Sequence, residues 1–532
     1  KVAICEQMED PKLAKGIVKR KIIKVITPGT ITLENAVASK KNNYISCISE
    51  KNDMISIALM DVTTGECLWS ACPVSAMEDV LFDIFSVYEP SELIYAHMDS
   101  YIEPILTYLR NRLAQCTVTP FAADDMTDYA DIGAPYFDEK DWAAAGTAAE
   151  CIGMLLTYVH EVMQSDIHHI SSLERIDNDS RLVVDGASLR HLEITQNVRD
   201  GGRKGTLLAV LDKTKTAMGG RLLRKWLEAP LLRICEITKR QDAVEDIINH
   251  EIMRQDIADT LDGIYDFERI LTRIETGTAS PKDLVALRES LAVIPKLKNI
   301  IQGASSELLK ELEARMSPHQ DVYDLLCRGI KDEPGVVIRN GGVIRDGYSK
   351  ELDEIRSIAA NSKEFLKKLE EEEKEKTGIK MKIGYTKVFG YYFEISHANT
   401  LPIPDYYVRK QTLVNAERYI TPELKEMEDT ILGAEDRLVQ LEYELFREIR
   451  DKIAAEVVRI QRTAKAVAKL DVFASLAVVA EQNNYCRPKL NENGTIDIKD
   501  GRHPVVEKMI NNDMFISNDT YLDNGKNRIA II

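Results

Sequence analysis

The sequence predicts a multidomain fold that combines α/β segments with a mainly α-helical segment. Three observations lead to this prediction. The 532 residues are too many for one hydrophobic core, and about one domain per 100 to 200 residues gives roughly three to five domains. Short apolar strand patterns alternate with helical patterns in the first third of the chain. Further on, long charged helical patterns flank a short Tyr-rich β pattern that begins at Met381.

The first 165 residues carry the α/β signal. A strand pattern opens the chain (KVAICEQ), and a second one ends in a Pro28-Gly29 turn. From about 34 to 165 we predict an α/β domain, with helices at 76–89, 100–115 and 141–164. Its strand patterns are YISCISE, MISIALMDV, ECLWSAC and ELIYA, and Thr-Thr-Gly joins the second and third as a hairpin.

Residues 170 to 345 have an almost wholly helical pattern, with Ser171, Asp177 and Ser280-Pro281 as expected helix starts. One helix in this stretch is expected to anchor the helical core through a single apolar face made of Leu222, Leu223, Trp226 and Leu227. The GGRKG turn at 201–205 lacks the G-x-x-x-x-G-K-[ST] spacing of a phosphate-binding loop, so we assign no nucleotide site there.

Two long helical patterns enclose the β segment that begins at Met381. The pattern before it has apolar or small residues three and four apart, and the pattern after it is predicted to run unbroken to about Leu470, some 65 to 70 Å. We therefore predict coiled-coil-like arms that carry a small β-rich tip. The apolar or small positions are Leu352, Ile355, Ala359, Ser362, Leu366 and Leu369 before the tip, and Leu424, Met427, Ile431, Ala434, Leu438, Leu441 and Leu445 after it.

Charge is distributed unevenly along the chain. The net charge is -17, and residues 75–165 hold 16 acidic against 3 basic side chains. Three basic islands interrupt this acidity, with 7 basic and 3 acidic residues in 1–28, 8 and 2 in 196–225, and 6 and 3 in 378–420. Such islands are compatible with a polyanion that touches selected surfaces, although they are equally typical of solvated faces.

Cysteine usage and hydropathy bound the class of protein. The nine cysteines are scattered without a C-x-x-C pair, which argues against a disulfide framework or a zinc site and favours a reducing, cytoplasmic location. No apolar run approaches the roughly 18 residues of a membrane span. The chain starts without Met and stops on the apolar run RIAII, so we expect both ends to be cut from a longer protein.

Two other features invite a catalytic interpretation. Asp61 lies on the predicted hairpin, where ribonuclease-H-type nucleases place a magnesium ligand, but one carboxylate does not make a two-metal site. His168 and His169 are adjacent, and neighbours in sequence rarely share one metal, so we expect a local or core role for them.

Six segments, in one order, resemble the DNA mismatch-repair family MutS. They are KGIVKR with VITPGT, RDGGRKGTLLAVLDKTKTAMGGRLLRKWLEAPL, KVFGYYFEI, RKQTLVNAERYITPELKEMEDTILGAE, GRHPVVE and FISNDT. The resemblance covers nearly the whole chain. It implies the tail of a mismatch-recognition domain (1–30), a ribonuclease-H-like connector (34–165), a helical core with levers (170–376 and 429–485), a clamp (377–428) and the start of a P-loop ATPase domain (490–532).

By this resemblance the complete protein would bind mismatched double-stranded DNA as a homodimer, would use ATP and Mg²⁺, and would act with a downstream mismatch-repair ATPase. The Phe-x-Glu motif that reads the mismatch would precede Lys1, and no Walker motif is present, so ATPase activity is expected of the complete protein only. Phe515 and Ile516 match the segment that packs against adenine.

In the clamp, the candidate DNA-backbone contacts are Lys387, Arg409, Lys410 and Arg418, with Gln411 and Asn415 as neutral donors. Tyr391, Tyr392 and Phe393 are expected to serve β-packing. Three alternatives stay open at this point: a noncatalytic coiled-coil scaffold whose arm tip binds protein, a nuclease that uses Asp61, and a family relative that binds recombination intermediates.

Overall fold

A computed structural model describes residues 1–8, 16–32, 38–98, 100–124, 126–165, 167–176, 180–182, 184–335, 338, 341–386, 388–510 and 515–530, without the side chains of residues 359, 360, 362, 363 and 435. The chain divides into two compact units. Unit 1 comprises Lys1–Ala279, Ala286–Gln320 and Ile453–Ile532, and unit 2 comprises Ser280–Val285 and Asp321–Lys452. The fold is mixed α/β with several domains, as predicted.

Unit 1 contains a six-stranded mixed sheet in the order β7-β6-β3-β4-β5-β8. The β3/β4 and β4/β5 pairs are antiparallel, which confirms the predicted hairpin, and the remaining pairs are parallel. The strands are β3 (Ile45–Lys51), β4 (Met54–Asp61), β5 (Glu66–Pro73), β6 (Glu92–Ala96), β7 (Thr117–Pro120) and β8 (Ser172–Arg175). Strands β7 and β8 were not predicted, and β8 lies in the stretch that the sequence analysis assigned to helices.

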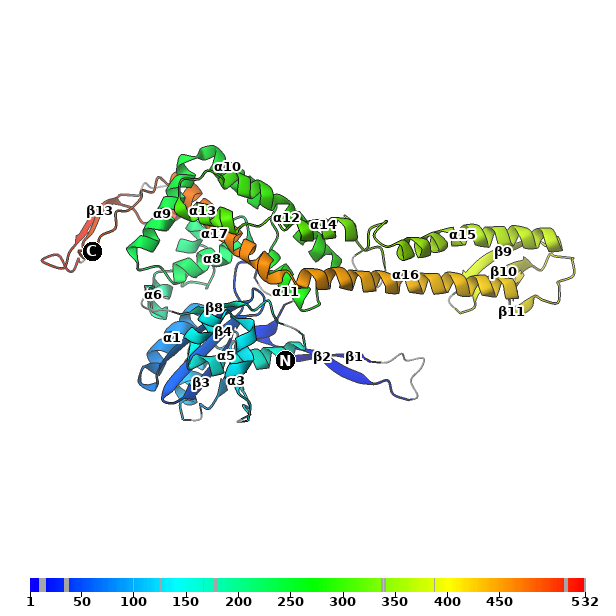
Figure 1. Ribbon diagram of the computed structural model, residues 1–532, viewed down its shortest axis with the longest axis horizontal. Coiled ribbons are helices and arrows are strands. Elements are labelled where there is room, and N and C mark those ends of the chain that lie inside the picture. Colours follow the sequence, from blue (N-terminus) through cyan, green and yellow to red (C-terminus); the bar gives the residue numbers. More distant parts are fainter. Residues whose placement is uncertain are drawn as a thin grey trace. The chain divides into compact units, whose positions relative to one another are not determined.

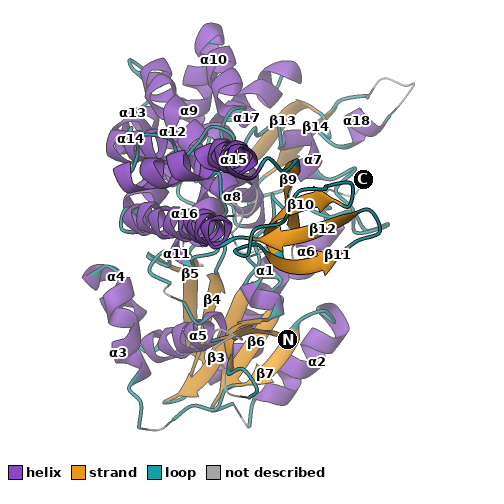
Figure 2. Cartoon of the chain, turned by 90° about the vertical axis from the view of Figure 1, so that its right-hand side faces the viewer, coloured by secondary structure: helices purple, strands orange, loops and turns teal. Residues whose placement is uncertain are grey.

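Helices cover both faces of this sheet, so the residues of its central strands β3 and β4 are almost continuously buried. One face packs on α1 (Met77–Tyr88) and α2 (Ile102–Arg112). The other packs on α3 (Tyr129–Gly133), α4 (Glu139–Ala145) and α5 (Ala148–Met163), and Figure 2 shows the two helical layers on either side of the strands.

The prediction of a single helix over 141–164 is wrong. The structure has two helices here, α4 and α5, bent by 110° relative to each other. Gly146 lies between them with a φ of +51°, a backbone conformation that favours glycine. Among the described residues no single helix is long and apolar enough to cross a membrane, and only this bent pair meets a test of length and composition when taken together.

The two predicted N-terminal strands, β1 (Val2–Gln7) and β2 (Arg20–Ile26), pair antiparallel. The 3₁₀ turn Pro28–Thr30 follows, and the fully buried carboxylate of Glu92 on β6 holds it. Glu92 accepts hydrogen bonds from the Thr27 hydroxyl, from the Gly29 amide at 3.1 Å and from the Tyr158 hydroxyl at 2.6 Å. This turn is therefore tied to the α/β domain by one side chain.

The helical core of unit 1 is organised around α17, which contacts α7, α8, α9, α10, α11 and α13. Leu223 and Val472 are buried at the α8/α17 contact, with Leu222, Trp226 and Leu227 packed against them, as predicted. The helices after the sheet are α6 (Gly186–His191), α7 (Leu207–Leu211), α8 (Ala217–Glu228), α9 (Ile234–Asn249), α10 (Glu251–Leu261), α11 (Phe267–Glu275), α12 (Pro281–Ile301, shared by the two units), α13 (Glu307–Arg315), α14 (Gln320–Gly329, mostly in unit 2) and α17 (Val457–Gln482).

A buried carboxylate fixes the start of α8. Asp471 on α17 is 1% exposed and accepts hydrogen bonds from the Lys215 amide at 2.9 Å, the Thr216 amide at 2.8 Å and the Thr216 hydroxyl at 2.7 Å. A Cβ on Gly219 would lie 2.2 Å from the Asp471 Oδ2. The first glycine of TAMGG, Gly219, is therefore required by this close approach.

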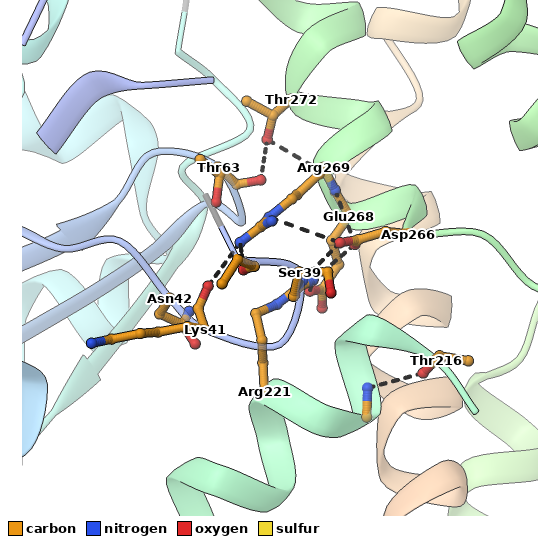
Figure 3. A network of polar contacts seen from close by, with 12 residues as sticks. Ser39, Lys41, Asn42, Thr63, Thr216, Arg221, Asp266, Glu268, Arg269 and Thr272 are labelled. Atoms are coloured by element: carbon orange, nitrogen blue, oxygen red, sulfur yellow. Dashed lines mark hydrogen bonds and ion pairs between the residues drawn. The ribbon is translucent and has the colours of Figure 1, made fainter. Parts of the chain in front are cut away.

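Polar contacts join the helical core to the α/β domain inside unit 1 (Figure 3). The Arg221 guanidinium is buried and donates to Asp266 at 2.7 and 2.8 Å, to Glu268 at 2.7 Å and to the Ser39 carbonyl at 2.7 Å. Arg269 donates to the Lys41 carbonyl at 2.8 Å. Because these buried charges are paired and bonded to backbone oxygens, they fix the loop that leads into β3.

Besides most of α14 and the start of α12, unit 2 contains two long helices and a four-stranded antiparallel sheet in the order β11-β12-β10-β9. Figure 1 shows α15 and α16 running alongside each other, with the strands at one end. The elements are α15 (Lys350–Thr377), β9 (Met381–Thr386), β10 (Gly390–Ser396), β11 (Val408–Thr412), β12 (Ala416–Ile420) and α16 (Pro422–Ala454).

The returning helix does not run unbroken to Leu470, which corrects the prediction. It ends at Ala454, and α17 begins at Val457. A turn intervenes, closed by a 2.9 Å hydrogen bond from the Glu456 amide to the Ile453 carbonyl. Of the predicted apolar positions on the arms, Leu352, Leu366, Leu369, Leu424, Ile431 and Leu441 are buried, and the side chains of Ala359 and Ser362 lie outside the described residues.

The last part of the described chain forms the short strands β13 (Ile496–Gly501) and β14 (Asn518–Leu522), paired antiparallel, and the one-turn helix α18 (Val506–Met509).

Candidate nucleic-acid interface

The sheet of unit 2 has one apolar and one polar face. The apolar face, which includes Met381, Phe393, Ile395 and Tyr419, packs on residues of α15 and α16 such as Leu369 and Ile431. Phe393 is fully buried and Tyr392 is 6% exposed, which confirms the expected β-packing of these aromatic residues.

A row of cross-strand neighbours forms the polar face. In register across the four strands lie Gln411, Arg418, Glu394 and Lys382. Arg418 donates to the Gln411 side-chain oxygen at 2.8 Å and to Glu394 at 3.3 Å. The sheet therefore brings Gln411 and Arg418 together and engages both side chains in hydrogen bonds within the sheet.

Arg418 also covers an aromatic ring. Its guanidinium lies 4.3 Å from the centroid of Tyr392, and a Cβ on Gly384 would lie 2.8 Å from that ring. Tyr392 is thus enclosed between a glycine and a guanidinium, a cation–π arrangement that holds the Arg418 side chain on the sheet. Arg418 is consequently 19% exposed at its side chain, the most covered of the described candidate cations.

Arg409 and Lys410 lie on the edge strand β11, away from the Arg418 row. Arg409 is in register with Tyr419 of the apolar face, and its side chain, 62% exposed, pairs with Glu417 at 3.1 Å. The register shifts between Arg409 and Gln411, which makes Lys410 the extra residue of a β-bulge. The Lys410 side chain is exposed and makes no hydrogen bond or ion pair with a described residue.

Asn415 lies in the turn between β11 and β12, exposed beside Val414, which is 91% exposed, and its carbonyl accepts the His397 amide at 3.1 Å. Lys387 lies outside the described residues. The candidates therefore divide into a covered pair (Gln411 and Arg418) and an exposed group (Arg409, Lys410 and Asn415).

The sequence analysis did not select two other cations of this segment as candidate DNA contacts. Lys380 and Lys382 are exposed, and no hydrogen bond or ion pair joins either side chain to a described residue. Strand alternation was the available signal for Lys382, because it shares a face with Glu394 and Arg418.

Three carboxylates of the arm helices hold the sheet in place. Glu428 on α16 accepts the Tyr391 amide at 2.9 Å, and Glu370 on α15 accepts the Ile383 amide at 2.9 Å. Glu373, also on α15, is fully buried and accepts the Tyr407 hydroxyl at 2.7 Å. Burial and the bond to Glu373 raise the pKa of Tyr407 well above its ordinary value, so this hydroxyl stays a donor.

Comparison with known proteins decides the family. The profile of MutS domain III matches residues 187–477, which is more than half of the chain, MutS domain I matches 1–35, and MutS domain II matches 43–171. The chain belongs to the MutS family. The polar face and the bulged edge of the unit 2 sheet thus lie within the MutS domain III match.

Among curated relatives, the DNA mismatch repair protein MutS of Lachnoclostridium phytofermentans is 44% identical over 544 residues, covering 100% of this chain and 58% of the relative. The MutS proteins of Alkaliphilus oremlandii and Caldanaerobacter subterraneus are each 42% identical, again over 100% of this chain, and are covered to 62% and 61% of their own lengths. The chain spans about three fifths of the length of these MutS relatives.

Asp61 lies within the MutS domain II match, where its environment is structural. It is fully buried, and its carboxylate accepts the Thr63 hydroxyl at 2.7 Å, the Thr63 amide at 2.8 Å and the Asn42 side-chain amide at 2.8 Å. Across the part of the chain that the structure describes, no three His, Cys, Asp or Glu side chains gather as metal ligands would. Asp61 thus caps the turn after β4.

His169 has a core role, as expected. It is fully buried, its Nε2 lies 2.9 Å from the Val62 carbonyl, and burial lowers its pKa to about 4, so the ring is neutral near pH 7. His168 stacks on Tyr136 with the ring centroids 5.4 Å apart.

Phe515 and Ile516, the candidate adenine contacts by resemblance to MutS, precede β14. Phe515 is half-buried, and Ile516 is 80% exposed. Ile516 is thus available to a ligand or to further protein.

Proposed function

We propose that this chain takes part in DNA mismatch repair by binding mismatched double-stranded DNA, and that the tip of unit 2 contributes contacts to the duplex backbone. Membership of the MutS family supports the process. The observation that supports the tip as a contact surface is a set of exposed cations whose side chains make no hydrogen bond or ion pair with a described residue, Lys380, Lys382 and Lys410.

Such cations bind a phosphate without first breaking an ion pair, whereas Arg409 must leave Glu417 and Arg418 must leave Glu394 and the Tyr392 ring. We therefore assign Lys382 and Lys410 as direct phosphate contacts, Arg409 and Asn415 as edge contacts, and Arg418 with Gln411 as residues that hold the polar face. Contacts of this kind fix position on DNA without reading sequence.

In the domain assignment that goes with this proposal, residues 1–30 are the tail of a mismatch-recognition domain, 34–165 a connector, 170–376 and 429–485 the core with its levers, 377–428 a clamp, and 490–532 the start of an ATPase domain. The complete protein would use ATP and Mg²⁺, with Phe515 and Ile516 against the adenine. It would embrace DNA as a homodimer and engage a downstream mismatch-repair ATPase.

Fluorescence anisotropy with matched and mismatched duplexes at several salt concentrations tests the clamp. The double variant Arg409→Ala/Lys410→Ala should bind both duplexes more weakly and to the same degree. The slope of log K against log salt should flatten by about 0.9 for each phosphate that the variant no longer neutralises. Lys310→Ala, which removes an exposed lysine without a described side-chain partner from α13 of unit 1, should leave affinity and slope unchanged.

A loss of mismatch preference alone, with unchanged affinity for matched DNA, would refute the backbone-contact role. No binding to either duplex by the unsubstituted chain would favour an arm that docks on protein. For the adenine assignment, Phe515→Ala in the complete protein should lower ATP affinity, and unaltered nucleotide binding would remove Phe515 from the site.

A further inference from the structure

A cavity of about 160 Å3, partly open to solvent, lies within unit 1 between the edge of the six-stranded sheet and helices α8 and α17. Thr64 from the β4–β5 turn and Glu174 from β8 line the sheet side. Lys225 from α8 and Lys465 and Lys469 from α17 line the helical side. At about 30 Å3 for each water molecule, the cavity has room for roughly five.

Two of the lining cations form no ion pair or hydrogen bond with a carboxylate of the described residues. Lys465 and Lys469 lie one turn apart on α17, and neither side chain makes a hydrogen bond or an ion pair with a described residue. Burial lowers the pKa of Lys469, and the positive charges of Arg315, Arg240 and Lys465 lower it further, against the opposing effect of Glu174. Positive charge is thus concentrated on this side of α17.

Arg240 on α9 adds to this charge. Its guanidinium rests 3.5 Å from the centroid of the Trp226 ring instead of on a carboxylate. Burial, together with the positive charge of Arg181, lowers the pKa of Arg240 to about 10, although Glu236 acts in the opposite direction. A half-buried cation without an anion costs free energy, which a bound anion would offset.

The carboxylates that line the cavity already have partners. Glu66 pairs with Lys225 and accepts the Tyr44 hydroxyl at 2.6 Å, and Glu174 lies 3.5 Å from Lys225. Glu268 accepts from Arg221 at 2.7 Å. Among the described lining residues, Lys465 and Lys469 therefore remain as the cations without a hydrogen-bonded carboxylate.

A hydroxyl supplies a second, independent indication. The Thr64 Oγ1 is shielded from solvent and has no hydrogen-bond partner in the described part of the chain, yet Thr64 lines the cavity. A buried hydroxyl without a partner is uncommon in folded proteins and points to a ligand or a solvent molecule beside it.

We propose that this cavity binds a small phosphate-class oxyanion, with Lys465 and Lys469 as its cationic contacts and the Thr64 hydroxyl as a neutral donor. Tetrahedral oxyanions offer several acceptors to converging donors, as this arrangement requires. The nearby Glu174 favours a protonated phosphate, which donates a hydrogen bond to a carboxylate, over sulfate, which has no proton to donate at neutral pH. The site is independent of the clamp and of the proposed DNA binding.

Isothermal titration of the 532-residue chain with sodium phosphate tests the site, in a phosphate-free buffer at pH 7.5 with the ionic strength held constant by NaCl. Parallel titrations use pyrophosphate and sulfate. We expect saturable binding of phosphate or pyrophosphate and weaker binding of sulfate. Only a nonspecific salt effect, or sulfate binding as tight as phosphate, would overturn the proposal.

Two variants locate the binding. Lys469→Met and Thr64→Val should each weaken phosphate binding on the order of tenfold, as expected for one hydrogen bond to a charged group. Lys310→Met, which changes an exposed lysine on α13, is the matched control and should bind like the parent chain. Thr64→Val keeps the side-chain shape and so remains informative if Lys469→Met fails to fold. Parent-like phosphate affinity in Thr64→Val would refute the assignment.

Discussion

Glu228 should make unit 1 more stable as the pH falls from neutral. It is the last residue of α8, with a side chain 13% exposed, and it accepts a 2.9 Å hydrogen bond from the Arg224 Nε. Burial raises its pKa to about 7, and the negative charge of Glu89 acts in the same direction, while Arg224 and Thr195 act against it. The folded state therefore binds this proton more tightly than the unfolded chain does.

The sign and size follow from proton linkage. Because the folded pKa of about 7 lies above the ordinary 4.5 of a glutamate, the carboxylate destabilises the fold at pH above 7. This penalty is relieved as the pH falls through 7 toward 4.5. Each pKa unit corresponds to about 1.4 kcal/mol, so the free energy of unfolding should gain roughly 2 kcal/mol from this group between pH 7.5 and pH 5.

Urea unfolding of the parent chain and of Glu228→Gln at both pH values, in phosphate-free buffers, measures the effect. Other carboxylates have lowered pKa values, such as Asp212 and Asp266, and lose stabilising charge in acid. The informative quantity is therefore the difference between parent and variant. As the pH falls, the free energy of unfolding of the parent should rise relative to that of Glu228→Gln. A difference between the two that stays constant from pH 7.5 to pH 5 would refute the reasoning.

Two further predictions concern packing. Gly219→Ala should lower the unfolding midpoint of unit 1 by an amount equivalent to about 1 to 3 kcal/mol, because the new Cβ would displace the Asp471 carboxylate. Gly433→Ala on α16, where a Cβ would have nothing within 4 Å, should be neutral or stabilising by up to ~1 kcal/mol. Thermal unfolding of the two variants compares these effects. Glu442→Ala should leave the Val343 amide, which donates to the Glu442 carboxylate at 2.9 Å, without its acceptor. Hydrogen exchange of the Val343 amide should then be more than tenfold faster than in the parent chain. An unchanged exchange rate would contradict this prediction.

The sequence predicted the elements whose signal is local. Strands β3 to β6 of the α/β domain, the β4–β5 hairpin and the apolar face of α8 follow from periodicity and turn residues, and the structure confirms them. Strand β8, of sequence SLER, is too short and polar to show alternation, and it exists because it pairs with β5. The turn between α16 and α17 contains no Gly or Pro, so the helical period passes through it without a visible break.

The candidate interface was predicted as a set of charges, and the structure sorts those charges by partner. Counting residues identified Arg409, Lys410 and Arg418, but only the pairing of β11, β12 and β10 shows that Arg418 is held by Glu394 and the Tyr392 ring. The bulge at Lys410 depends on strand register, which sequence patterns do not determine here.

The Glu92 carboxylate determines where this polypeptide can be divided. It is fully buried, and three donors surround it, two of them from the turn at residues 27–29. A fragment of the α/β domain that begins after this turn would leave Glu92 with the Tyr158 hydroxyl alone and would carry a partly unsatisfied charge in its interior. A shortened version for crystallography or binding studies should therefore begin before Thr27.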